Sequence, residues 1–180
     1  KVNRLFSPLA KVIGTHFKTT ESLLKGRCVN VGFPLRQGYT STLSVPQKAR
    51  SKLGLSPNLL TLLVFGGSQG ALGINMKFLE AVWELSDFVN HFQVIHLTGN
   101  KPFEKEVRKA YEKLNLRAFV ASFESQMDLV WTAADLTISR AGACSIAEMV
   151  EFEVPAILVP YPSSSENHQV ENANFLANEI

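Results

Sequence analysis

The stretch Leu59–Ala71, LLTLLVFGGSQGA, is the segment from which the fold is most directly inferred. Its first seven residues form an apolar run, which predicts a strand buried on both faces. Gly66 and Gly67 end this strand, and the next segment, Ala71–Val89, carries apolar side chains at helical spacing. A buried strand, a glycine turn and an amphipathic helix in immediate succession are typical of α/β proteins.

The same alternation of short apolar runs and amphipathic stretches continues on both sides of this segment. Further strands are predicted at Cys28–Val31, Phe92–Leu97, Ala118–Ala121, Leu136–Ser139 and Ala156–Val159. Further helices are predicted at Pro46–Leu53, Phe103–Leu114, Met127–Ala134, Gly142–Glu151 and Asn167–Ala177. Apolar strands separated by helices indicate a parallel sheet. The sequence therefore predicts an α/β fold with a Rossmann-like parallel sheet and helices on both faces.

The composition excludes several classes of protein. The chain has 180 residues and a mass of 19.9 kDa, which suits one domain. Apolar residues make up 46% and charged residues 19%, which argues against a disordered tail or a coiled-coil rod. The net charge is +2 and the basic residues are scattered, so we expect no nucleic-acid partner.

The cysteines and the hydropathy bear on the cellular compartment. Cys28 and Cys144 are far apart in the sequence, which favours reduced thiols in the cytosol over a disulfide scaffold or a structural zinc site. No apolar run reaches the ~20 residues that a membrane span needs. Residues Lys1–Lys11 lack the apolar core of a signal peptide. Because the chain starts without methionine, we expect a fragment or an excised domain.

The turn Gly66–Ala71 is a candidate anion site, because ligands of open α/β sheets bind at the carboxyl ends of the strands. Glycines permit a tight turn and a close approach of the backbone to a ligand. The N–H groups at the start of the next helix favour a phosphate, and Ser68 adds a hydroxyl. The turn matches neither Walker A nor the G-x-G-x-x-G fingerprint. The alternative is that the glycines only allow close packing of strand and helix.

A second strand-to-helix turn, Ser139–Cys144, is followed by Glu148 about one helical turn later. Two helix starts at one edge of the sheet would form a two-sided anion site. The Glu148 carboxylate can accept hydrogen bonds from both hydroxyls of a ribose, although a solvated helix residue is the simpler interpretation. Arg140 is interpreted as a structural partner of Asp135 or Glu148 rather than as a phosphate ligand.

Polar residues also precede and begin the last predicted helix. The side-chain amide of Gln169 offers both a donor and an acceptor to sugar hydroxyls, and Asn167 is expected to cap the helix. Arg36 follows a strand and a proline, so it could reach a phosphate at the same edge or remain a surface residue. The histidines show no metal-ligand spacing, and no nucleophile elbow or paired-carboxylate motif is visible. We expect neither a metal nor a cofactor.

Taken together, three segments resemble the C-terminal domain of the MurG family of bacterial peptidoglycan glycosyltransferases. The segments are LLVFGGSQGALGIN (62–75), ISRAGACSIAEM (138–149) and VPAILVPYPSSSENHQVENA (154–173). Their order and spacing make the resemblance specific, and it extends from about Val29 to the end of the chain. It implies the GT-B fold, in which two Rossmann-like domains face each other across a cleft.

The resemblance implies that this chain is the C-terminal half of a GT-B enzyme. Residues 1–25 would be the tail of an N-terminal acceptor domain and a linker, and residues 26–180 a UDP-sugar-binding domain with truncated C-terminal helices. The implied reaction is inverting transfer of N-acetylglucosamine from UDP-N-acetylglucosamine to a muramyl-pentapeptide on undecaprenyl pyrophosphate (lipid I to lipid II) in peptidoglycan synthesis. The implied location is peripheral, on the cytoplasmic face of the bacterial inner membrane.

The same resemblance assigns roles to individual residues. Arg36 and Ser68 would contact the diphosphate, the backbone at Glu124 the uracil, Glu148 the ribose, and Gln169 the N-acetylglucosamine. The full set that it implies for substrate binding is Arg36, Gly67, Ser68, Gln69, Gly70, Glu124, Ala143, Cys144, Ser145, Ile146, Ala147, Glu148 and Gln169. The proposed base of the family lies in the N-terminal domain, so no catalytic residue is assigned, and this chain alone is expected to be inactive.

Three other functions remain open from the sequence. The first is another GT-B transferase that uses a UDP-sugar with a glycolipid, diacylglycerol or dolichol-linked acceptor. The second is a non-catalytic subunit that binds a nucleotide sugar. The third is a UDP-sugar epimerase, which would convert the donor without any acceptor.

Overall fold

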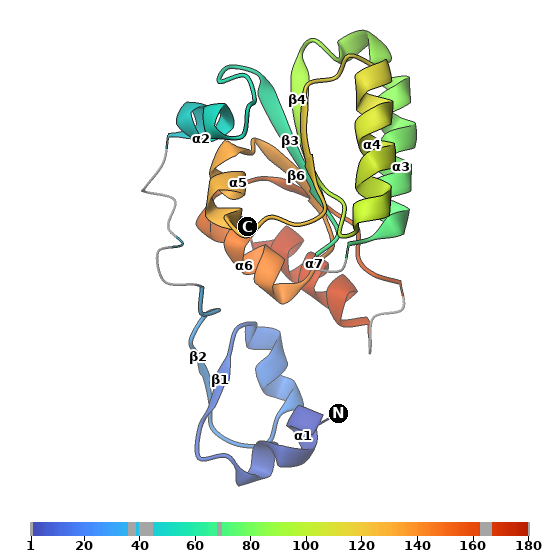
Figure 1. Cartoon of the computed structure of the whole chain (residues 1–180). Coiled ribbons are helices and arrows are strands. Elements are labelled where there is room, and N and C mark those ends of the chain that lie inside the picture. The colour runs from blue at the N-terminus through green and yellow to red at the C-terminus, as the bar shows by residue number, and fades with distance from the viewer. Residues whose placement is uncertain (1, 36–38, 40–44, 68–69, 163–166, 180) are drawn as a thin grey trace.

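The larger part of the chain is built around a five-stranded parallel sheet (Figure 1). The structure is a computed structural model that describes all residues except 1, 36–38, 40–44, 68–69, 163–166 and 180. The strand order is β5-β4-β3-β6-β7. The strands are β3 (Leu60–Phe65), β4 (Phe92–Leu97), β5 (Ala118–Ala121), β6 (Leu136–Ser139) and β7 (Ala156–Leu158).

Helices cover both faces of this sheet, as Figure 1 shows. Val64 and Val94 point to one face and pack with α3 and α4, whereas Leu63, Phe65 and Ile95 point to the other and pack with α2, α5 and α6. The helices are α2 (Pro46–Lys52), α3 (Leu72–Glu84), α4 (Lys101–Lys113), α5 (Met127–Ala133), α6 (Ala143–Glu151) and α7 (His168–Glu179). The predicted Rossmann-like sheet with helices on both faces is therefore confirmed.

The strand order explains where a ligand can bind. From β3 the chain builds outward through β4 to β5, and then returns to place β6 on the other side of β3. The carboxyl ends of β3 and β6 consequently diverge into helices on opposite faces, α3 and α6. Such a reversal of strand order opens a crevice at the carboxyl edge of an α/β sheet.

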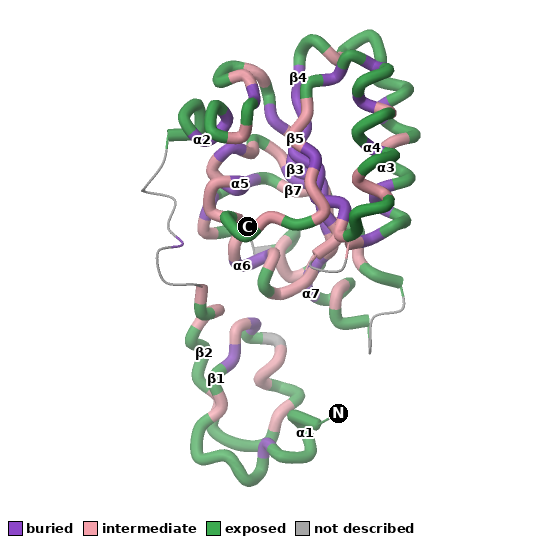
Figure 2. The backbone as a smooth tube through the Cα atoms, viewed as in Figure 1, coloured by how far each residue is buried: buried purple, intermediate pink, exposed green. Residues whose placement is uncertain are grey.

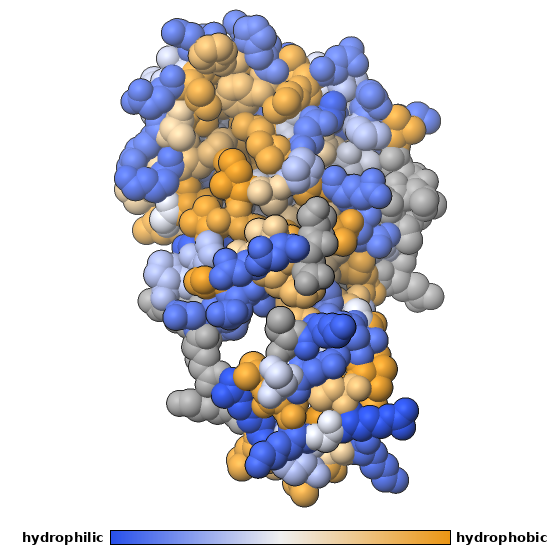
Figure 3. All heavy atoms as spheres, turned by 180° about the vertical axis from the view of Figure 1, so that it is seen from behind, coloured by the Kyte–Doolittle hydropathy of each residue, from blue (hydrophilic) through white to orange (hydrophobic). Residues whose placement is uncertain are grey.

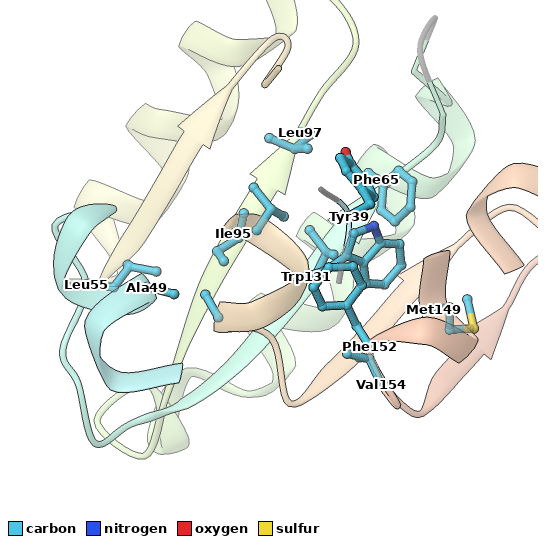
Figure 4. Packing of buried hydrophobic residues seen from close by; sticks show 13 residues of the cluster. Tyr39, Ala49, Leu55, Phe65, Ile95, Leu97, Trp131, Met149, Phe152 and Val154 are labelled. Atoms are coloured by element: carbon cyan, nitrogen blue, oxygen red, sulfur yellow. The ribbon is translucent and has the colours of Figure 1, made fainter. Parts of the chain in front are cut away.

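The centre of the sheet is fully enclosed. All six residues of β4 are buried, and Figure 2 shows the buried residues concentrated along the inner strands. The face covered by α5 holds an aromatic group in which the rings of Phe65 and Trp131 meet edge to face, with centroids 5.5 Å apart (Figure 4). The core therefore lies directly beneath the carboxyl edge of β3.

Residues near the N-terminus form a second, smaller sheet. It consists of β1 (Ile13–Thr15) and β2 (Cys28–Asn30), paired in parallel, and α1 spans Val2–Phe6. The strand predicted at residues 28–31 thus exists, but it pairs with β1 and not with the five-stranded sheet. The Phe17 ring meets Phe175 of α7 at a centroid distance of 5.0 Å, which joins the two parts.

Apolar side chains remain on parts of the surface, and Figure 3 shows them gathered on the rear face of the molecule. Large exposed apolar residues include Ile157 of the edge strand β7 and Leu5 of α1. Among the described residues, no helix is long and apolar enough to cross a membrane.

Candidate functional site

The turn between β3 and α3 is shaped by glycines. Gly67 and Gly70 have positive φ angles of 90° and 73°, which residues with side chains rarely adopt, and the Gly70 N–H donates to the Gly67 carbonyl at 2.9 Å. A Cβ atom on Gly70 would lie 2.4 Å from the carbonyl oxygen of Thr98. Gly70 is thus required by both conformation and close packing, as the packing interpretation of the sequence expected, whereas Gly67 is required by conformation.

The second glycine turn lies at the same edge of the sheet. Phe65 pairs with Ser139 in the register of β3 and β6, so the two strands end side by side. Gly142 is the residue before α6 and has no side chain to cap the helix. Ala71, before α3, provides no side-chain cap either. Two helix N-termini therefore meet the same crevice with backbone N–H groups to offer.

A cavity of about 290 Å³ opens between these two turns. Its lining combines apolar and aromatic side chains with polar groups. The residues that line it are Tyr39, Phe65, Gly67, Leu97, Ser122, Phe123, Glu124, Met127, Cys144, Ser145 and Glu148. Five of the residues predicted for substrate binding are among them, namely Gly67, Glu124, Cys144, Ser145 and Glu148. A larger groove of about 850 Å³ between α6, β7 and α7 contains none of the residues at the ends of β3 and β6.

Glu148 is held in place at this cavity by a tryptophan. The indole Nε1–H of Trp131 donates to the Glu148 Oε2 atom at 2.8 Å, and Trp131 itself is completely buried. The sequence did not predict this contact. A carboxylate has about four acceptor positions, so one indole bond leaves capacity for a diol. The bond fixes the direction of the carboxylate without neutralising its charge.

Glu124 contributes differently from Glu148. Its Oε1 atom accepts the backbone N–H of Gln126 at 2.8 Å, so its side chain stabilises the turn before α5. Its neighbour Phe123 is 65% exposed at the cavity rim. The segment thus presents a fixed backbone and an aromatic ring to the cavity.

Several other predicted residues lie away from the cavity lining. Ile146 and Ala147 are buried, and Ala143 packs against the cluster of Phe17 and Ile146. Gly70 lies near the end of the first turn and packs against Thr98. The Gln169 side-chain oxygen accepts the backbone N–H of Tyr161 at 2.9 Å. Three predicted residues lie outside the described residues, namely Arg36, Ser68 and Gln69.

Arg140 has a structural role, but its predicted partners were wrong. Its guanidinium donates to the carbonyls of Val159 and Pro160 at 3.0 and 2.9 Å, and it lies 5.3 Å from the centroid of the Tyr161 ring. Arg140 follows β6 and points toward the segment after β7. The two carboxylates that were predicted as its partners bind other side chains instead. Asp135 accepts from Arg50, and Glu148 accepts from Trp131.

The structure adds lining residues that sequence reasoning missed. Tyr39 is buried, and its ring meets Phe152 edge to face at a centroid distance of 6.1 Å. Figure 4 shows Tyr39 close to Phe65 and Trp131. The only signal in the sequence is a single aromatic residue within the polar stretch Gln37–Ser44, a pattern that predicts a loop and no more.

The described part of the chain contains no cluster of three His, Cys, Asp or Glu residues that could hold a metal ion. The polar groups at the cavity are instead the start of α6, the backbone of the first glycine turn at Gly67, serine hydroxyls and the carboxylates of Glu124 and Glu148. These groups suit a ligand that carries both an anionic end and a hydroxyl-bearing end.

Fold and site together define a Rossmann-like α/β domain with a cavity at the carboxyl edge of its sheet, and comparison with known proteins identifies its family. The model of the glycosyltransferase family 28 C-terminal domain matches residues 61–180. The chain belongs to this family.

Individual relatives are similar over nearly the whole chain. One from Protochlamydia amoebophila (strain UWE25) is 45% identical over 177 residues, which are 97% of this chain and 46% of the relative. Another, from Aquifex aeolicus (strain VF5), is 38% identical over 96% of this chain and 48% of the relative. Both are named UDP-N-acetylglucosamine–N-acetylmuramyl-(pentapeptide) pyrophosphoryl-undecaprenol N-acetylglucosamine transferase.

A solved structure supports the same relationship. The crystal structure of Acinetobacter baumannii MurG superposes with a TM-score of 0.70 at 26% identity and covers 98% of this chain and 47% of that protein. The chain therefore spans about half the length of the relatives that it matches.

Proposed function

We propose that this chain is the donor-binding half of the enzyme that transfers N-acetylglucosamine from UDP-N-acetylglucosamine to the lipid-linked muramyl-pentapeptide. The observation that carries the proposal is the cavity bordered by the first glycine turn at Gly67, by the uncapped start of α6 and by an oriented carboxylate, Glu148. The names of the relatives supply the particular donor and acceptor. The acceptor would bind largely to the other half of the protein.

The chemistry of the reaction suits this arrangement. When the sugar leaves, negative charge develops on the diphosphate of UDP, and this charge must be stabilised. The backbone N–H groups and dipoles at the starts of α3 and α6 would stabilise it without moving, which lowers the barrier to transfer. Arg36, which lies outside the described residues, would add a positive charge to the same group.

The remaining contacts would orient the donor. The free oxygen capacity of Glu148 would accept the two ribose hydroxyls, with Trp131 holding the carboxylate in position. The backbone at Phe123 and Glu124 would bind the uracil. Because the oxygen of the Gln169 amide is engaged by Tyr161, its NH₂ group would donate to the sugar hydroxyls. The general base would come from the acceptor-binding half.

Calorimetry with the 180-residue chain tests the donor site. We expect UDP and UDP-N-acetylglucosamine to bind, and ADP to bind more weakly. Glu148→Ala should weaken UDP binding at least tenfold, because hydrogen bonds to a charged group contribute about 1.5–3 kcal/mol. Glu106→Ala, an exposed change on α4, is the matched control and should leave binding unchanged. Failure of the folded wild-type chain to bind UDP would contradict the proposal.

The acceptor and the location are tested in the whole protein. We expect the 180-residue chain to bind the donor without transferring it, and the complete protein to act on the undecaprenyl-linked acceptor at the cytoplasmic membrane surface as a peripheral enzyme. Transfer to a diacylglycerol or dolichol-linked acceptor would instead favour another transferase. Conversion of the UDP-sugar without any acceptor would favour an epimerase, and binding by the complete protein without turnover would favour a non-catalytic subunit.

A further inference from the structure

Three buried polar side chains form a line of hydrogen bonds behind the first glycine turn. The Tyr111 hydroxyl of α4 lies 2.7 Å from Nδ1 of His96 on β4. The other ring nitrogen of His96, Nε2, lies 3.1 Å from Oδ1 of Asn75 on α3. Asn75 Nδ2 lies 2.9 Å from the carbonyl oxygen of Thr98. All four residues are almost completely buried.

The direction of every bond in this line is fixed by its last member. A carbonyl oxygen can only accept, so Asn75 must donate to Thr98 through Nδ2 and accept through Oδ1. His96 must therefore carry its proton on Nε2, and its Nδ1 atom accepts from the Tyr111 hydroxyl. Burial lowers the pKa of His96 to about 3 and raises the pKa of Tyr111, so both groups remain neutral near pH 7.

The line of hydrogen bonds ends at the Thr98 carbonyl, which is packed against Gly70 of the glycine turn. The Thr98 N–H donates to the Ala121 carbonyl at 2.9 Å, and the Gly99 N–H donates to the Ser122 carbonyl at 2.9 Å. The Thr98 carbonyl, held by Asn75, lies where a Cβ atom of Gly70 would be. The polar line thus fixes the surface against which the backbone of the turn is packed.

Packing alone does not require polar groups at these positions. The surrounding cluster consists of apolar residues such as Val64, Phe78 and Val107, and apolar side chains would fill the space without any cost of polar desolvation. Fully satisfied buried polar networks instead specify one geometry. Asn75 also lies at the end of the first turn of α3, so the same bond fixes the start of that helix relative to β4.

We propose that Asn75 and His96 are positioning residues for the diphosphate end of the donor. They hold the Thr98 carbonyl against Gly70 and thereby set the backbone position of Gly70 at the end of the glycine turn. The inference rests on the proposed function, because it concerns the same nucleotide site. It adds a division of labour within that site, since the side chains of the line act at Gly70, whereas the segment of Phe123 is bound through the backbone N–H groups of Thr98 and Gly99.

The test compares UDP with uridine, which lacks the diphosphate. For Asn75→Ala, we expect the Kd of UDP to rise at least tenfold and the Kd of uridine to change less than twofold. Tyr111→Phe is the matched control, because it removes a hydroxyl from the far end of the line and leaves the bond from Asn75 to Thr98. It should lower the melting temperature without changing the ratio of the two Kd values. Equal changes for UDP and uridine in Asn75→Ala would overturn the inference.

A second measurement needs no substitution and applies even when Asn75→Ala does not fold. In the wild-type chain, ¹⁵N NMR should show His96 as the Nε2–H tautomer down to about pH 4, in line with its buried, neutral state. Addition of UDP should shift the side-chain amide signals of Asn75, and addition of uridine should not. The opposite tautomer, or amide signals unaffected by bound UDP, would overturn the inference alone. Wild-type protein that does not bind UDP would overturn the proposed function and this inference with it.

Discussion

At the scale of single residues, the glycines of the first turn differ sharply from a glycine only three positions later. Gly70 has a positive φ and no room for a Cβ atom, whereas a Cβ atom on Gly73, within α3, would meet no neighbouring atom within 4 Å. Their different surroundings therefore give a direct test of the role of the turn.

We expect Gly70→Ala to weaken UDP binding more than tenfold and to destabilise the protein by about 1–2 kcal/mol or more, because left-handed backbone is unfavourable for a residue with a Cβ atom. Its Cβ atom would also displace the Thr98 carbonyl. Gly73→Ala should leave binding unchanged and raise stability by up to about 1 kcal/mol through helix propensity. Calorimetry and urea denaturation check both variants. Equal changes in UDP binding and in stability for the two variants would show that Gly70 has no special role in the turn.

His96 gives a prediction about the pH dependence of stability. Its pKa is lowered from 6.5 to about 3 in the folded chain, so only the unfolded chain takes up this proton between those values. The free energy of unfolding should therefore decrease as the pH falls below 6.5, by up to about 1.4 kcal/mol per pH unit from this group. The substitution His96→Gln removes the ionisable imidazole and therefore this contribution to the pH dependence.

Urea denaturation of wild type and His96→Gln at several pH values measures this effect. The variant should be less stable than wild type at pH 7.5, and the difference should shrink by about 2 kcal/mol by pH 5. His16, whose pKa burial also lowers, is present in both proteins and cancels in the comparison. A difference that stays constant with pH would show that His96 takes up its proton as readily in the folded chain as in the unfolded chain.

At the scale of elements, one buried arginine connects α2 to the sheet. The Arg50 Nη2 atom donates to both oxygens of Asp135 at 2.7 Å, and its Nε atom donates to the Ala133 carbonyl at 2.9 Å. The second carboxylate oxygen of Asp135 also accepts the N–H of Thr61 at the start of β3. Arg50 therefore fixes α2, the end of α5 and the starts of β3 and β6 relative to one another.

Arg50→Met should lower the free energy of unfolding by about 2–3 kcal/mol, because it leaves the buried Ala133 carbonyl without its donor and removes the bonds to Asp135, whose side chain is 40% exposed. Lys77→Met is the control. Lys77 pairs with Glu80 at 2.6 Å, but their side chains are 79% and 59% exposed, so its loss should cost less than about 1 kcal/mol. Urea denaturation measures both changes. A loss below about 1 kcal/mol for Arg50→Met would show that α2 is held by apolar packing alone.

Most elements of the large sheet were predictable from the sequence. The runs at 92–97, 118–121 and 136–139 became strands with the predicted bounds. The helix predicted at Ala71–Val89 instead ends at Glu84, and a short 3₁₀ turn follows at Ser86–Phe88. Periodicity does not mark such an end, because the apolar spacing continues through Leu85 and Phe88.

At the scale of the whole molecule, the site exists because β3 and β6 are neighbours. The residues at the ends of these strands, Phe65 and Ser139, are 74 positions apart in the sequence (139 minus 65) but pair directly in the sheet. Their neighbouring turns line one cavity together with residues that follow β5. The chain spans about half the length of the relatives that it matches.

Local patterns in the amino-acid sequence were enough to predict most elements, the glycine turns and the family to which the chain belongs. These features are encoded locally, because apolar periodicity and backbone freedom act over a few residues. Three contacts could be learned only from the folded arrangement: Trp131 orients Glu148, Arg140 binds carbonyls and not Asp135, and a polar line from Tyr111 ends against Gly70. Such contacts join residues that meet only after the strand order and register are set.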